Sequence, residues 1–203
     1  CVIKNGDEDM KFAKLMLGAG LVAGACWMLP AQAAEISGIK IDDTVSLAGK
    51  NLVLNGYGMR QIFVVKAYAA ALYLSEKKNN AADVQALTTP KRIALHIQRE
   101  IDSDEFGQLF ITSMNKNSTK EEKAKVVNQT VKFGEMFASM EKVKKGDVVT
   151  LDWVPGKGTV STLNGKQIGE ALPDIAFYNA VLRIWLGDNP VQSDLKRGLL
   201  GEK

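Results

Sequence analysis

The order of elements in this 203-residue sequence predicts an α+β fold, with an antiparallel sheet covered on one side by helices. Three observations lead to this prediction. Alternating apolar and polar residues, typical of half-buried strands, occur toward both ends of the chain. Two helical stripes with capping residues lie between these strand segments. Asn164-Gly165 and the segment 155–158 have the turn residues that join antiparallel strands.

The first 33 residues are expected to be absent from the mature protein. Residues 10–33 have the three parts of a secretory signal peptide: Lys11 and Lys14, the uncharged apolar run 15–29, and the small-residue cleavage site 31–33. Residues 1–9 are interpreted as an upstream artefact, because Met10 is the natural start. The mature domain is therefore predicted to be residues 34–203.

The predicted location is the periplasm, with secretion as the less favoured alternative. The apolar run is shorter than the ~20 residues that a membrane span needs, so no stable span is expected after the signal is removed. Lipidation at Cys26 is not favoured, because Ala23 stands where a bulky aliphatic residue is usual.

Composition excludes several kinds of site from the mature domain. Cys1 and Cys26 both lie in the part expected to be removed, and His96 is the only histidine. A cysteine or histidine metal cluster is therefore excluded, and no metal or other cofactor is expected. The net charge of +3 is spread along the chain, which argues against nucleic acid as a partner.

The first half of the domain is predicted to be mainly strands. Short strands are expected over Ile36–Ile41 and Thr44–Leu54. A turn bracketed by Gly56 and Gly58 is then expected to lead into a strongly apolar strand that ends near Leu74. A short helix at 81–87 and a half-buried strand at 91–101 follow.

The second half is predicted to contain helices, a meander and two more helices. Asp102 or Ser103 can cap the first helix, and Ser118 or Thr119 the second, with Glu121 or Glu122 completing a capping box and an end near Gly146. The later elements follow from turn and capping residues: strands at 148–154 and 159–163, a long helix from 173 to 187, and a shorter helix at 191–200.

The strand that follows Gly58 carries the candidate site. With a period of two, Arg60, Lys66 and Tyr68 share one face with aliphatic residues, a mixture that suits an apolar cleft with a polar end. An arginine can hold a carboxylate by two charge-assisted hydrogen bonds, and a tyrosine hydroxyl can add a third. Lys66 would compete for the anion or lie along the wall. The alternative is an ordinary strand with a solvated Arg60 and Lys66 and a tyrosine at its rim.

Several short motifs together resemble the chalcone isomerase superfamily, and most closely its bacterial exported chalcone isomerase-like proteins. They are Gly58-Met59-Arg60, the stretch 66–74, Arg99-Glu100-Ile101-Asp102, Lys145-Gly146-Asp147 and Ala180-Val181-Leu182. The resemblance covers about Ile36 to Gly201. It implies the family's open-faced sandwich, an antiparallel sheet with helices on one side.

The resemblance also implies a set of site residues. Enzymes of the family use a turn arginine, a strand threonine, a tyrosine and an asparagine of the next helix, and a residue of the last helix. The arginine is kept as Arg60, and Tyr68 takes the threonine position, with Tyr73 as the alternative match. The other positions fall near Phe106, Ser113 and Tyr178.

The favoured function is non-catalytic binding of a fatty acid or a similar small apolar acid, because Phe106 lacks the hydroxyl that the enzymes have on that helix. In this interpretation Arg60 and Tyr68 hold the carboxylate, as in the family's fatty-acid-binding members. One alternative is an isomerase or lyase that acts on an enone or phenolic substrate, with Arg60 stabilising an oxyanion. Another is a scaffold with a vestigial cleft and an unidentified protein partner.

Overall fold

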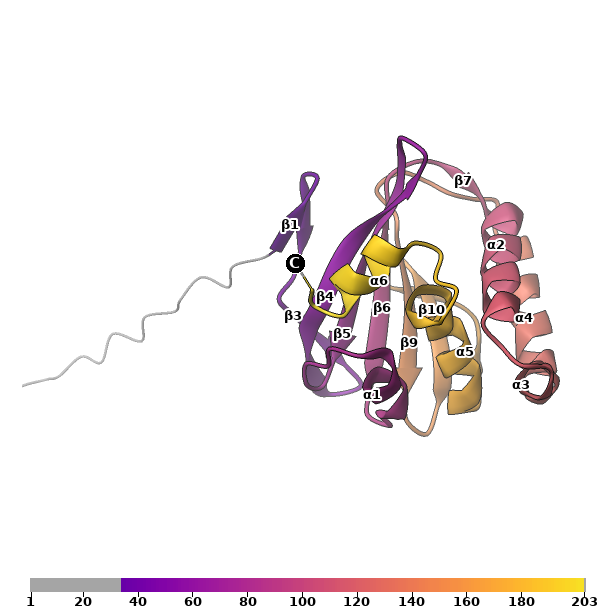
Figure 1. Cartoon of the computed structure of the whole chain (residues 1–203). Helices are drawn as coiled ribbons and strands as arrows, with labels where there is room; N and C mark the ends of the chain where they lie inside the picture. Colours follow the sequence, from indigo (N-terminus) through magenta and orange to yellow (C-terminus); the bar gives the residue numbers. More distant parts are fainter. Residues whose placement is uncertain (1–33, 203) are drawn as a thin grey trace, which may run out of the picture. The chain divides into compact units, whose positions relative to one another are not determined.

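The computed structural model describes residues 34–202. Its centre is a seven-stranded, wholly antiparallel sheet in the order β11-β10-β9-β6-β5-β4-β3 (Figure 1), which confirms the predicted fold class. The strands are β3 Thr44–Leu47, β4 Lys50–Ile62, β5 Val65–Leu74, β6 Lys91–Ile97, β9 Val148–Val154, β10 Gly158–Leu163 and β11 Lys166–Leu172.

Helices cover one face of this sheet and enclose the main hydrophobic core. The helices are α1 Ala81–Ala86, α2 Ser103–Lys116, α3 Lys120–Lys125, α4 Val127–Ala138, α5 Ile175–Leu186 and α6 Ser193–Leu199. The core combines the inner face of β5, β6 and β9 with the apolar stripes of α2, α4 and α5. Its largest fully buried side chains include Trp185, Tyr178, Phe133 and Phe137. None of the helices within residues 34–202 is long and apolar enough to cross a membrane.

A smaller apolar cluster lies on the opposite face of the sheet. The segment predicted as a strand at 36–41 forms a hairpin of β1 Ala34–Ile36 and β2 Ile39–Ile41. Ile41 packs with Leu52, Tyr73 and Ala94 in this cluster.

The glycine pair near Arg60 is not a turn, which corrects the sequence prediction. Gly56 and Gly58 lie in the middle of β4, and the hairpin turn is at Phe63–Val64, between β4 and β5. A Cβ atom on Gly56 would lie 2.1 Å from the Gly198 carbonyl oxygen. These glycines therefore allow α6 to pack directly on the strand.

Two further boundaries differ from the prediction. The second predicted helix is divided into α3 and α4, because Val126 leaves the helical region with φ −113° and ψ 13°. Its predicted capping box is confirmed as Thr119 and Glu122. The strand predicted at 91–101 ends at Ile97, and a separate short pair forms from β7 Ile101–Asp102 and β8 Lys142–Val143.

Candidate ligand-binding site

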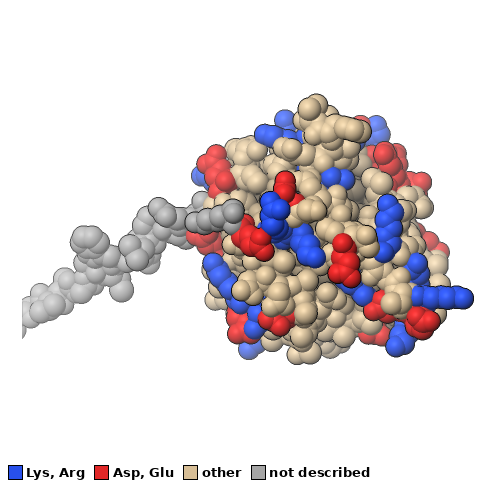
Figure 2. Space-filling model, viewed as in Figure 1, with Lys and Arg blue, Asp and Glu red and all other residues tan. Residues whose placement is uncertain are grey.

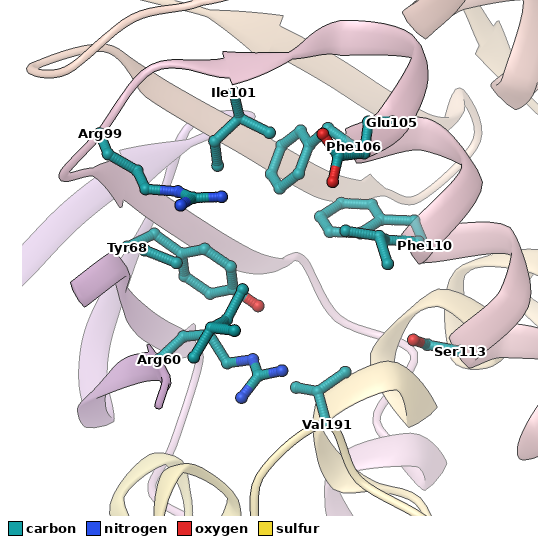
Figure 3. Close-up of a pocket in the computed structure, with 12 residues that line it drawn as sticks. Arg60, Tyr68, Arg99, Ile101, Glu105, Phe106, Phe110, Ser113 and Val191 are labelled. Atoms are coloured by element: carbon teal, nitrogen blue, oxygen red, sulfur yellow. The ribbon is translucent and has the colours of Figure 1, made fainter. Parts of the chain in front are cut away.

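A cavity of about 380 Å³ lies between the β4–β5 hairpin and helix α2 (Figure 3). This volume falls in the range of ~300–1,000 Å³ that is usual for small-ligand sites. The lining residues come from β4, β5, the segment after β6, α2 and the chain before α6: Arg60, Ile62, Ala67, Tyr68, Arg99, Ile101, Glu105, Phe106, Leu109, Phe110, Ser113 and Val191.

The hairpin places Arg60 and Tyr68 directly opposite each other. Arg60 lies on β4 and Tyr68 on β5, and their Cα atoms are register partners. They share a face because of this pairing across two strands, whereas the sequence pattern placed both on one strand.

Gln192, at the start of α6, fixes the position of Arg60. Its side-chain oxygen accepts hydrogen bonds from Arg60 Nη1 at 3.3 Å and from the backbone N–H of Gln61 at 2.9 Å. Its amide nitrogen donates to the Met59 carbonyl oxygen. Among the described residues, Arg60 forms no ion pair and uses only Nη1 as a donor, so Nε and Nη2 are available to an anion.

The Tyr68 hydroxyl is prepared to donate a hydrogen bond. It accepts from Trp185 Nε1 at 3.0 Å, which leaves its own proton uncommitted. Burial raises the pKa of Tyr68 to about 12, although the hydrogen bond from Trp185 and the charge of Arg60 act in the opposite direction. The hydroxyl therefore stays protonated at neutral pH.

Arg99 is a second cation of the cavity, which the candidate set from the sequence did not include. It follows β6 at the point where the Gln98 N–H donates to the Ala67 carbonyl oxygen. In Figure 3 its guanidinium lies on the opposite side of Tyr68 from Arg60. No described acid forms an ion pair with Arg99. The position of Arg99 just after an apolar strand is the feature of the sequence that could have marked it as a cavity residue.

The rest of the wall is mainly apolar. Phe106 and Phe110 on α2 lie 4.4 Å apart between ring centroids, and Phe106 also meets the Tyr68 ring edge-on at 6.3 Å. Ser113 lies farther along α2, and Glu105 is an acid that also lines the cavity (Figure 3). The cavity thus offers two cations, one acid and the Tyr68 hydroxyl beside an aromatic and aliphatic wall.

Two residues of the predicted set lie outside the cavity. Lys66 is exposed, and its Nζ donates to Ser37 Oγ at 2.9 Å, because the register shift after Arg60 breaks the expected alternation. Tyr178 lies on α5, is fully buried and donates to the Leu151 carbonyl oxygen at 3.2 Å. Tyr73 belongs to the cluster on the other face of the sheet, so Tyr68 is the partner of Arg60.

The described residues contain no group of three or more acids, histidines or cysteines that could hold a metal ion.

The chemistry that the geometry offers is recognition of an anionic group attached to an apolar body. Arginine N–H groups and a neutral hydroxyl recognise the anion, and the phenylalanine rings accommodate the apolar part.

Comparisons with known proteins were made on sequence and on fold. A model of the family described as chalcone isomerase-like matches residues 33–201. Among solved structures, the chain is similar to a fatty-acid-binding protein of Arabidopsis thaliana, with a TM-score of 0.61 and 12% sequence identity over 83% of this chain and 96% of that chain. No curated protein sequence matches significantly. At this identity the structural likeness concerns the fold.

Proposed function

We propose that this chain, which belongs to the chalcone isomerase-like family, is an exported non-catalytic protein that binds a fatty acid or a similar apolar carboxylate. The ligand's carboxylate lies between Arg60 and Tyr68, and its hydrocarbon part lies along Phe106 and Phe110. The closeness to bacterial exported members and the periplasmic location belong to the same proposal.

The observation that carries the proposal is the pairing of Arg60 with Tyr68 in one largely apolar cavity. Both residues have hydrogen-bond donors that no described residue uses, and Gln192 and Trp185 hold them in place. A bidentate arginine with a neutral hydroxyl suits a carboxylate. The fold likeness to a protein that is named for fatty-acid binding supports the same choice of ligand.

The alternatives receive less support from the site. An isomerase would need the hydroxyl that Phe106 lacks, and the two predicted polar partners Ser113 and Tyr178 do not both reach the cavity. A scaffold with a vestigial cleft would have its cleft filled by side chains, whereas this one retains about 380 Å³.

The test uses the chain from Ala34 onward, which contains both hydrophobic clusters. Lipid extraction with mass spectrometry identifies any retained acid, and a fluorescent fatty acid gives Kd. Arg60→Ala should weaken binding by ~10- to 150-fold, because a hydrogen bond to a charged group contributes ~1.5–3 kcal/mol. Arg197→Ala, which removes an exposed arginine of α6, is the matched control.

Wild-type protein that retains no lipid and binds no fatty acid would contradict the proposal. Turnover of an enone or phenolic substrate that disappears in Arg60→Ala would instead establish the isomerase alternative. Export is tested separately by expressing the whole chain and determining the mature N-terminus, which is expected at Ala34.

A further inference from the structure

The β4–β5 hairpin ends in an exposed apolar tip formed by Phe63, Val64 and Val65. Phe63 and Val64 are 96% and 93% exposed, whereas no large hydrophobic residue elsewhere in the described chain exceeds 53%, and Val65 is 42% exposed. The hairpin projects at the top of Figure 1, and Figure 2 shows an uncharged projection there with Lys or Arg side chains on both sides. Nothing within residues 34–202 covers this tip.

The backbone of the turn makes these residue types unexpected. Only two residues, Phe63 and Val64, connect the paired Ile62 and Val65. Phe63 has φ 54°, in the left-handed region that favours glycine or asparagine. Turn geometry and exposure therefore both disfavour a phenylalanine, and its side chain contributes little to the core. A position that breaks local rules in this way suggests a use outside the folded chain.

The shape of the tip favours a lipid surface over a protein partner. A stable protein interface takes ~20–30 residues a side, and a convex tip of three residues falls far short of this. A small aromatic and aliphatic projection is instead suited to the apolar boundary of a bilayer.

Charge complementarity points the same way for an anionic membrane. Lys66 follows the tip directly, and Arg99 lies just beyond the end of β6, at the wall of the cavity. Neither forms an ion pair with a described acid, whereas Glu100 beside Arg99 is already paired with Lys142. Lys66 beside the apolar tip, and Arg99 at the adjoining wall of the cavity, can therefore approach anionic lipid headgroups.

The tip is continuous with the wall of the cavity. Ile62, immediately before it, and Ala67 and Tyr68, shortly after it, all line the cavity. We infer that the hairpin tip docks this protein on an anionic membrane and brings the cavity to the surface in which fatty acids partition. The delivery of ligand in this inference rests on the proposed function, but the docking does not.

The test measures binding to vesicles of phosphatidylcholine, with and without phosphatidylglycerol, by the chain from Ala34 onward. The double variant Phe63→Gly/Val64→Ser should reduce vesicle binding about tenfold or more, because it removes the phenylalanine that would be buried in the membrane. Glycine suits the φ of residue 63, so the fold is retained. Val131→Ser, at an exposed position of α4, is the matched control, and this variant should bind vesicles like wild type. Lys66→Gln should reduce binding about fivefold, and only to anionic vesicles.

Wild-type protein that fails to bind both kinds of vesicle, or a tip variant that binds as well as wild type, would overturn the docking inference. So would a wild-type dimer that becomes monomeric in the tip variant, because the tip would then be a self-association surface. Fatty-acid Kd measured without vesicles separates the two proposals. This Kd should be unchanged in the tip variant. If the wild-type protein bound no fatty acid, that result would count against the proposed function alone.

Discussion

The most informative single change is Tyr68→Phe, because one hydroxyl serves both the folded structure and the proposed ligand. In the free protein this oxygen accepts from Trp185 Nε1 at 3.0 Å in a buried position. Its removal leaves the indole N–H without that partner. An unsatisfied buried donor costs ~1–3 kcal/mol, so the free energy of unfolding should fall by about that amount.

The same change should weaken ligand binding by a separate amount. The lost bond would run from a neutral hydroxyl to a charged carboxylate, which contributes ~1.5–3 kcal/mol, or ~10- to 150-fold in Kd. Urea unfolding gives the first quantity, and titration with a fatty acid gives the second. The two losses are measured independently in the same protein.

Tyr178→Phe is the matched control for this experiment. Its hydroxyl is also buried and also makes one hydrogen bond, to the Leu151 carbonyl oxygen, but it lies outside the cavity. We expect a loss of stability of ~0.5–1.5 kcal/mol and no change in Kd. If Tyr68→Phe lost stability yet bound the fatty acid as tightly as wild type, the hydroxyl would be structural only and the assigned carboxylate site would be wrong.

Four further predictions concern the cavity and the core. Affinity should rise about fourfold for each added methylene until the cavity is filled, because each buried CH₂ contributes ~0.8 kcal/mol; a Kd series over saturated acids measures this, and a flat series would contradict an apolar wall. Glu105→Gln should leave the affinity for a carboxylate unchanged or raise it, since it removes a like charge from the cavity; weaker binding by titration would oppose the assigned polarity. Gly56→Ala should lower the free energy of unfolding, measured in urea, by ~1–3 kcal/mol, because the added Cβ would overlap Gly198. It should also weaken ligand binding, because α6 and Gln192 would shift. Unchanged stability would refute the close packing. Burial lowers the pKa of Lys91 to about 8, so the unfolded chain retains this proton to higher pH than the folded protein does. The free energy of unfolding should therefore rise between pH ~8 and ~10, by at most about 3 kcal/mol. Urea unfolding of Lys91→Met should show a flatter rise.

The predictions from the sequence succeeded where local patterns determine structure. The capping box at Thr119 and Glu122 and the Asn164-Gly165 turn both depend on residues close together in the chain, and both are present. The antiparallel sheet followed from the same kind of local signal. Arg60, Tyr68, Phe106 and Ser113 come together in one cavity. Strand spacing had suggested the pair of Arg60 and Tyr68, whereas Phe106 and Ser113 came from the family resemblance.

The errors arose where distant segments decide the outcome. Gly56 and Gly58 resemble turn residues in the sequence, but their role is to accommodate α6, which is more than 130 residues later. The turn at Phe63 contains neither glycine nor asparagine, so no turn residue marked it. Because that turn was missed, the prediction treated the end of β4 and the whole of β5 as a single strand. It therefore assigned Lys66 to the same face as Arg60.

Whether the cavity holds or transforms its ligand depends on proton transfer at Tyr68. An effective general acid or base has a pKa near the working pH, but burial moves the pKa of this hydroxyl away from neutrality, to about 12. The hydroxyl accepts one hydrogen bond from Trp185, and its own O–H proton remains free to be donated. Arg60 likewise offers only N–H donors, because a guanidinium has no acceptor atom. Hydrogen-bond donors of this kind stabilise a negative charge, whether it is already present or develops during a reaction. A bound carboxylate brings such a charge with it and needs no proton transfer, whereas an isomerase that used Tyr68 for proton transfer would rely on a group whose pKa is far from neutrality, and this difference favours a binding function for the site.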